Sequence, residues 1–159
     1  MEESDSVLIH ELIDLCIHKE KENYAINSLE IKKTIHFGLR TLLMSMMDIE
    51  KNHVKMLMEL RLKPNLTDYF DETQLPEKQD WIALFKDVHF GDAMAYLDFL
   101  TMLILREEKM AKLYQLFCEA CSDNEMCFHC KTLEEDTRKK RSWALDRYEL
   151  EILSLRLSF

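Results

Sequence analysis

The chain has 159 residues, 47% of them hydrophobic and 32% charged, with a formal net charge of −9. This length and composition are typical of one globular domain with a sizeable core, and they exclude a disordered chain. The negative charge argues against nucleic acid and anionic membranes as main partners, because both select clustered Lys and Arg. With only 2 Gly and 2 Pro, long helices with few connections are favoured over sheets.

The sequence predicts no targeting segment and no membrane span. Residues 1–6 are acidic and lack the basic start and apolar run of a signal peptide. The longest nearly apolar stretch, 96–105, contains Asp98 and is far shorter than the roughly 20 residues that cross a bilayer. Five cysteines without a signal peptide indicate a reducing compartment, where thiols are core residues or metal ligands. We therefore expect a cytoplasmic protein.

Helical periodicity predicts four long helices, at 6–34, 38–62, 92–121 and 124–156. The breaks after the first and third helices are short, so each pair should form an antiparallel hairpin. Asp92 is the expected N-cap of the third helix. The apolar stripes of the first two helices are Ile9, Ile13, Ile17, Tyr24 and Ile31, and Leu39, Leu43, Met46, Leu57 and Leu60.

The segment 63–91 is long for a connection within a compact domain. It holds both prolines and four aromatic residues, which we expect to pack against the outside of the helices, with a short helix near 81–85. Two short hairpins joined by one long crossover form the ferritin-like version of a four-helix bundle. We therefore predict an all-α fold, a single ferritin-like four-helix bundle over 1–159.

Polar residues interrupt the apolar stripes at one position in each predicted helix. These are Glu20 in the first, Glu50 with His53 in the second, Glu107 in the third and Glu135 in the fourth. Glu20 and Glu50 lie ~20–24 Å from the first turn, and the other two glutamates lie at a similar distance from the second, at about 1.5 Å per residue. One buried layer is therefore expected, and buried carboxylates need compensating cations.

Carboxylates in this arrangement are typical of a site for two bridged metal ions. Such a site takes one Glu from each of two helices and a Glu-x-x-His motif from each of the other two. Glu50 and His53 fit that motif, since residues three apart share a helix face. In the fourth helix Arg138 follows Glu135 where the second His is expected, and a guanidinium has no lone pair for a metal.

Four segments carry a resemblance to rubrerythrin-type diiron-carboxylate proteins of the ferritin-like superfamily. Residues 17–27 resemble the first ligand helix of that family, 46–53 its Glu-x-x-His helix, and 105–114 its third helix. Residues 133–138 are similar to the second Glu-x-x-His, with Arg138 in place of His. The resemblance implies an iron or manganese site that reduces peroxide or oxygen species, with an unspecified electron donor.

Three arrangements of the layer remain open at this point. One is a single ion on a half-site of Glu20, Glu50 and His53, completed by Glu135. Another is an intact two-metal centre that also uses Glu107. The third is a metal-free bundle in which Arg138 and His53 neutralise the carboxylates, which suits a catalytically inactive interaction protein. We expect a bound ion rather than none, because buried carboxylates facing one Arg leave net negative charge. One ion is expected rather than two, because Arg138 cannot bind a metal.

The turn between the third and fourth helices carries a second candidate metal site. Its ligands would be Cys118, Cys121, Cys127 and Cys130, two pairs at three-residue spacing that face each other across the turn. Four thiolates are a suitable ligand set for zinc or iron. The alternative is that these cysteines seal the end of the bundle as small apolar residues, or form a reversible disulfide.

The remaining features concern partners and the solvent-exposed face. The methionines of 38–62, together with the apolar run 96–105, indicate a second buried face and so a homodimer. The basic run 138–141 is interpreted as solvated, with Lys139 and Lys140 turned away from Arg138.

Overall fold

The computed structural model describes residues 3–158, with side chains from residue 8 onward. The side chains of the acidic stretch 1–6 lie outside the described residues. Within the described part the chain is all-α, as predicted, and contains no strand beyond an isolated bridge between Phe70 and Cys121. The helices are α1 Glu3–Lys33, α2 Phe37–Arg61, α3 Lys78–Ala83, α4 Tyr96–Ala120 and α5 Asn124–Leu157, with 3₁₀ turns η1 Leu66–Tyr69 and η2 Glu72–Gln74.

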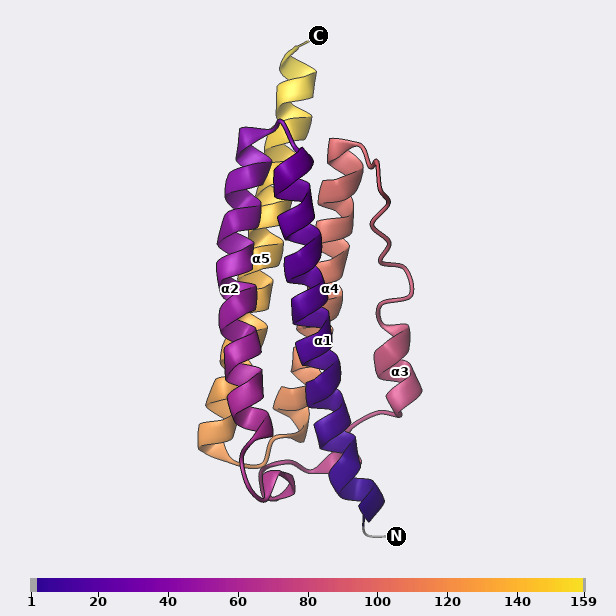
Figure 1. Cartoon of the computed structure of the whole chain (residues 1–159), viewed down its shortest axis with the longest axis vertical. Helices are drawn as coiled ribbons and strands as arrows, with labels where there is room; N and C mark the ends of the chain where they lie inside the picture. The colour runs from indigo at the N-terminus through magenta and orange to yellow at the C-terminus, as the bar shows by residue number, and fades with distance from the viewer. Residues whose placement is uncertain (1–2, 159) are drawn as a thin grey trace.

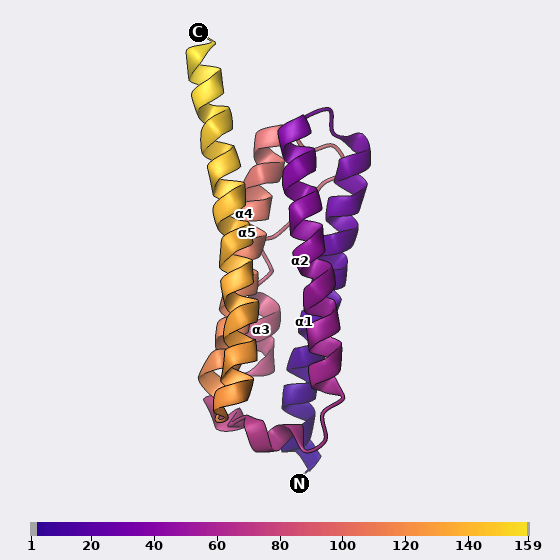
Figure 2. The same ribbon diagram turned by 90° about the vertical axis from the view of Figure 1, so that its left-hand side faces the viewer.

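The four long helices lie side by side as two antiparallel hairpins, α1–α2 and α4–α5 (Figure 1). The connection between them runs from one end of the bundle to the other and carries α3 along its side. Figure 2 shows that α5 extends past the other helices, at the end where the α1–α2 turn lies. None of the helices formed by residues 3–158 combines the length and apolar character needed to cross a bilayer.

The start of α4 differs from the expectation. The helix begins at Tyr96 after an extended Ala95, so the prediction of Asp92 as its N-cap is wrong. The reason is packing, because Phe90 contacts Phe99 with ring centroids 5.2 Å apart, and Met94 joins the same apolar cluster. At α5 a side-chain cap is present, because the Asp123 carboxylate accepts a hydrogen bond from the Met126 amide.

Two apolar clusters fill the bundle, one towards each end. The cluster at the α4–α5 turn includes Trp81, Phe70 and Phe85, so the predicted packing of the crossover aromatics is confirmed. The other cluster lies towards the α1–α2 turn and is built on Leu43, Met46, Leu100 and Leu103. The residues between these clusters, midway along the helices, are polar, and they form the candidate site.

Candidate functional site

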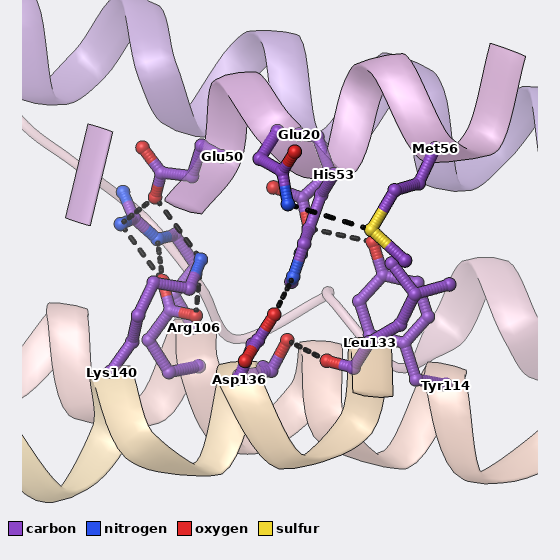
Figure 3. A network of polar contacts seen from close by, with 12 residues as sticks. Glu20, Glu50, His53, Met56, Arg106, Tyr114, Leu133, Asp136 and Lys140 are labelled. Carbon is purple, nitrogen blue, oxygen red and sulfur yellow. Dashed lines mark hydrogen bonds and ion pairs between the residues drawn. The ribbon is translucent and has the colours of Figure 1, made fainter. Parts of the chain in front are cut away.

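A layer of buried polar side chains crosses the middle of the bundle (Figure 3). Glu20 from α1, Glu50 and His53 from α2, and Glu107 from α4 each have 0% exposed surface. The sequence predicted that these four residues share one layer. Their contacts form a network of two parts, Glu20 with His53, and Glu50 with Glu107 through Lys140. Two cations from neighbouring helices, Arg106 and Lys140, complete this network.

Lys140 of α5 places its ammonium between two of the carboxylates. Its Nζ lies 3.2 Å from Glu50 Oε2 and 3.0 Å from Glu107 Oε2, and the side chain is fully buried. The Arg106 guanidinium contacts the same two residues, with Nη2 at 3.3 Å from Glu50 and 2.9 Å from Glu107. Both carboxylates are therefore neutralised by cations of this chain.

Asn27 of α1 holds the Glu50 carboxylate from the opposite side. Its Nδ2 donates to both oxygens of Glu50, at 2.9 and 3.1 Å, while its Oδ1 accepts a hydrogen bond from Arg106. Because the amide bridges an anion and a cation, it fixes the orientation of both. Asn27 is fully buried and occupies a stripe position of α1, whereas Tyr24, which was expected there, is exposed.

His53 lies between two carboxylates. Its Nδ1 is 3.2 Å from Glu20 Oε1 and its Nε2 is 3.0 Å from Asp136 Oδ2. Since a carboxylate accepts hydrogen bonds, both ring nitrogens have to donate, which describes an imidazolium. Tyr114 adds a hydrogen bond from its hydroxyl to Glu20 Oε1 at 2.6 Å. Each ring nitrogen of His53 therefore carries a proton, and neither has a free lone pair.

The pKa values in the layer follow from burial and these partners. Burial acts to raise the pKa of Glu20, but Lys140, His53 and Tyr114 outweigh it and lower that pKa below its usual range. For Glu50, burial prevails over Lys140 and Arg106 and raises the pKa to about 7. Burial acts to lower the pKa of His53, and the hydrogen bond and charge of Glu20 raise it overall.

The layer does not fit the two metal ions that the resemblance implies. The Lys140 ammonium occupies the space between Glu50 and Glu107, where a bridged ion would need both carboxylates. His53 uses both ring nitrogens on carboxylates, so it has no lone pair free for an ion. Among residues 8–158, no three His, Cys, Asp or Glu side chains are arranged as a metal-binding group.

The interpretation of α5 is corrected by the structure. The buried stripe of this helix is Met126, Cys130, Leu133, Thr137, Lys140 and Ala144. Glu135 is exposed, so the prediction that it joins the layer is wrong. Arg138 is exposed as well and pairs with Glu134 at 2.8 Å, while Lys140, interpreted as solvated, is buried. The error arose because Thr137 and Lys140 hold core positions without being apolar.

The spacing of the two hairpins would have given the correct register. Glu20 and Glu50 are 30 positions apart, and 30 positions after Glu107 comes Thr137. Lys140 then corresponds to His53, each lying 33 positions after the glutamate of its own hairpin. Thr137 donates its hydroxyl to the Leu133 carbonyl and offers no carboxylate to the layer. The α5 positions that match Glu50 and His53 therefore hold Thr137 and Lys140, and both side chains are buried.

Further members of the layer carried no signal in the apolar pattern. Arg106 directly precedes Glu107 in the sequence, and Asp136 lies between Glu135 and Thr137. Asn23, like Asn27, is buried on the stripe of α1. An uncharged amide or a long basic side chain is usually assigned to the surface. Contacts between helices place Arg106 and Asp136 in the layer.

The cysteine turn lies at the far end of the bundle from the α1–α2 turn (Figure 1). Cys118 and Cys121 end α4, and Cys127 and Cys130 lie in the first two turns of α5. All four are free thiols; Cys130 is buried and the other three are partly exposed. Cys16 is a core residue of α1.

Comparison with known proteins gives no further guidance to this site. The chain matches no protein-family model, no curated protein and no solved structure, so the function proposed below is argued from the geometry of the polar layer.

Proposed function

We propose that this chain is a metal-independent ferritin-like bundle that acts as an interaction protein and has salt bridges where its metal-binding counterparts hold ions. The observation that carries the proposal is the Lys140 ammonium between Glu50 and Glu107. An ammonium supplies the positive charge that buried carboxylates require, without the Lewis acidity or open coordination position of a metal. The two-hairpin topology supports the ferritin-like assignment.

An apolar surface at one end of the bundle supports the interaction role. Ile35 and Phe37 of the α1–α2 turn are 91% and 79% exposed. Beyond Glu151, which accepts a hydrogen bond from Tyr96, α5 continues with exposed Leu153 and Leu157. Exposed apolar side chains of this kind occur at protein–protein contact sites.

The proposal is tested by metal analysis of the intact chain, purified without a metal-affinity tag. Iron and manganese are measured in the wild type and in Glu50→Ala after incubation with each ion. We expect neither protein to retain a stoichiometric amount. About one ion per chain that is lost in Glu50→Ala would overturn the proposal, because Glu50 is a ligand in both metal-binding arrangements that the sequence predicts.

A single divalent ion beside Glu20 is the second candidate. It is favoured by one observation, that Glu20 Oε2 is buried and has no hydrogen-bond partner among the described residues. Binding there requires His53 to lose a proton and direct a lone pair at the ion. An ion retained by the wild type and by Arg106→Leu but lost in Glu20→Ala would establish this candidate.

A further inference from the structure

The last turns of α5 carry an apolar stripe that the rest of the described chain does not cover. This part of the helix lies beyond the end of the bundle (Figure 2). Leu150, Leu153 and Leu157 are 53%, 53% and 79% exposed. They are spaced by three and four residues, so they share one face of the helix, and the same spacing continues back to Asp146 and Trp143. Alternate spacings of three and four residues are those of the seam between two coiled helices.

The stripe runs into a hollow between α5 and the first turns of α2. The hollow has a volume of about 280 Å³, and its α2 wall includes Gly38 and Leu42. Its α5 wall consists of Trp143, Asp146, Arg147 and Leu150. On a helix, four residues with this spacing are the ones that surround a side chain inserted from a second helix in knobs-into-holes packing. The α2–α5 hollow is therefore shaped to receive one side chain of another helix, in line with the exposed leucines.

Two opposite charges flank the stripe on one side. Glu149 and Arg156 are exposed and seven positions apart, so they lie on the same face of α5. At about 1.5 Å per residue they are roughly 10 Å apart along the helix, which is too far for them to pair with each other. Neither forms an ion pair with another described residue, whereas Arg147 nearby pairs with Glu151 at 3.7 Å. Both charges are free to meet a partner.

An antiparallel pair of α5 helices fills the hollow of each copy. We consider the pair that sets Leu150 of one copy against Leu153 of the other. Leu157 of each copy then falls opposite Asp146 of the other copy, between Trp143 and Leu150, which is the position of the α2–α5 hollow. The same segment thus supplies both the inserted side chain and the hole, as an interface between identical chains requires.

The flanking charges favour the same orientation. In the antiparallel pair, Glu149 of each copy comes beside Arg156 of the other copy, because equivalent flanking positions face each other across the seam. A parallel pair sets residues of the same number at the same height, so it would align glutamate with glutamate and arginine with arginine. Opposite charges at the edge of an interface fix its orientation more than they add to its affinity.

We propose that the partner of this chain is a second copy, bound through antiparallel α5 ends with Leu157 of each copy in the α2–α5 hollow of the other. The proposal rests on the interaction role proposed above, and it specifies the partner and the orientation. The interface covers the three leucines that α5 exposes beyond the bundle and fills one hollow in each copy.

Sedimentation equilibrium of the intact chain and its charge variants at low ionic strength tests the orientation. Glu149→Lys and Arg156→Glu each bring like charges together at two places in the dimer, so each should raise the dimer Kd on the order of tenfold. The double variant Glu149→Lys/Arg156→Glu keeps the net charge and restores both pairs, so its Kd should return to that of the wild type. Glu135→Lys, at an exposed position in the middle of α5, is the control for the change of charge and should leave the Kd unchanged.

A matched pair of leucines tests the hollow. Leu155 is 47% exposed, and its spacing of two residues from Leu153 and from Leu157 places it on the opposite face of α5. Leu157→Ala removes the inserted side chain from both copies and should raise the dimer Kd on the order of tenfold or more. Leu155→Ala should leave the Kd unchanged. Because all these side chains are exposed, circular dichroism should show the wild-type helix content in every variant.

A chain that is monomeric at about 0.1 mM would overturn the proposal. The metal analysis described above would still decide whether the bundle is metal-independent, so the two proposals fail separately. A dimer that the double charge variant does not restore would overturn the antiparallel orientation. A dimer weakened as much by Leu155→Ala as by Leu157→Ala would show that the hollow is not the site of contact.

Discussion

Lys140 and Arg138 are two positions apart on α5, yet their environments are opposite. The Lys140 side chain is fully buried and contacts Glu50 and Glu107, whereas the Arg138 side chain is 53% exposed and pairs with Glu134. When a buried charge loses its partner, water cannot solvate it, and the loss of folding stability is large. A salt bridge at the surface contributes little to folding stability. The two positions therefore form a matched pair for mutation.

We expect Lys140→Met to lower the free energy of unfolding by about 3–5 kcal/mol, the cost of leaving buried carboxylates without a counter-ion. Arg138→Met should change it by no more than about 1 kcal/mol. Guanidinium denaturation at pH 7 measures both. Similar losses in the two variants would contradict the assignment of Lys140, rather than Arg138, as the cation of the layer.

Glu50 makes stability depend on pH. Its pKa is raised from 4.5 to about 7 in the folded chain, mainly by burial and despite Lys140 and Arg106. The folded state thus binds a proton more tightly than the unfolded state, so stability falls as pH rises from 4.5 to 7. At about 1.4 kcal/mol per pKa unit, this loss amounts to roughly 3 kcal/mol.

In Glu50→Gln that loss of stability between pH 4.5 and 7 should disappear, as followed by denaturation at several pH values. The exposed Glu59→Gln on the same helix serves as the control and should keep the wild-type profile. His53 adds a separate effect. Because its pKa is raised, its stabilisation is complete below 6.5 and is lost as pH rises through the folded pKa. An unchanged profile in Glu50→Gln would contradict the raised pKa.

At the scale of elements, α5 differs most from its expectation. Its buried stripe alternates spacings of four and three residues, as a helix in a bundle requires. Apolarity alone selects a different face, because Phe128 is exposed and Lys140 is buried. The stripe of α2, by contrast, was predicted correctly at Leu39, Leu43, Met46, Leu57 and Leu60, all of them buried.

The register of α5 can be tested by rebuilding the missing motif. The triple variant Arg106→Leu/Thr137→Glu/Lys140→His removes both cations and places Glu-x-x-His at the positions that match Glu50 and His53. We expect it to bind Mn²⁺ with at least one ion per chain in equilibrium dialysis, since the carboxylates then need a new cation.

Two controls accompany this variant. Arg138→His, which completes the motif with Glu135 in sequence, should gain no Mn²⁺, because both side chains face solvent. Arg106→Leu/Thr137→Gln/Lys140→Gln removes the cations without adding metal ligands and should remain unable to bind. Mn²⁺ binding by Arg138→His but not by the triple variant would contradict the register.

The candidate site was predictable in part. Glu20, Glu50, His53 and Glu107 were identified because a carboxylate within an apolar stripe is conspicuous in sequence. Asn27 and Arg106 were not, because a polar side chain next to a charged one looks the same at a surface and in a core. These two residues are recognised as buried only by their contacts with neighbouring helices. The hydrophobic pattern of a single helix carries no information on those contacts.

For the whole molecule, the exposed apolar residues gather at a different place from the predicted dimer face. Of the α2 methionines, Met44 and Met58 are the exposed ones, and within 96–105 Phe99, Leu100 and Leu103 are buried in the bundle. Ile35, Phe37 and the leucines at the end of α5 are also exposed, and they lie at the end of the bundle that holds the α1–α2 turn. A homodimer remains a prediction, and this end is where we expect its interface.

We expect the chain to elute as a dimer in size-exclusion chromatography with light scattering, and Leu153→Lys/Leu157→Lys to shift it to a monomer. Both leucines are exposed, so the folded helix content should be unchanged in circular dichroism. Met44→Lys/Met58→Lys on α2 is the control and should remain dimeric. If only the α2 variant dissociates, the interface is at the methionines, as the sequence indicated.

The sequence by itself determined the helical class, the two hairpins, the long crossover and the depth of three of the carboxylates. These follow from short-range properties, namely periodicity, turn residues and the rise of a helix. Only the tertiary structure decided which cations meet those carboxylates. The reason is that Arg106 and Lys140 reach the layer from α4 and α5, so their burial depends on the rotation of whole helices about their axes. That rotation set Lys140 rather than Arg138 against Glu50 and Glu107.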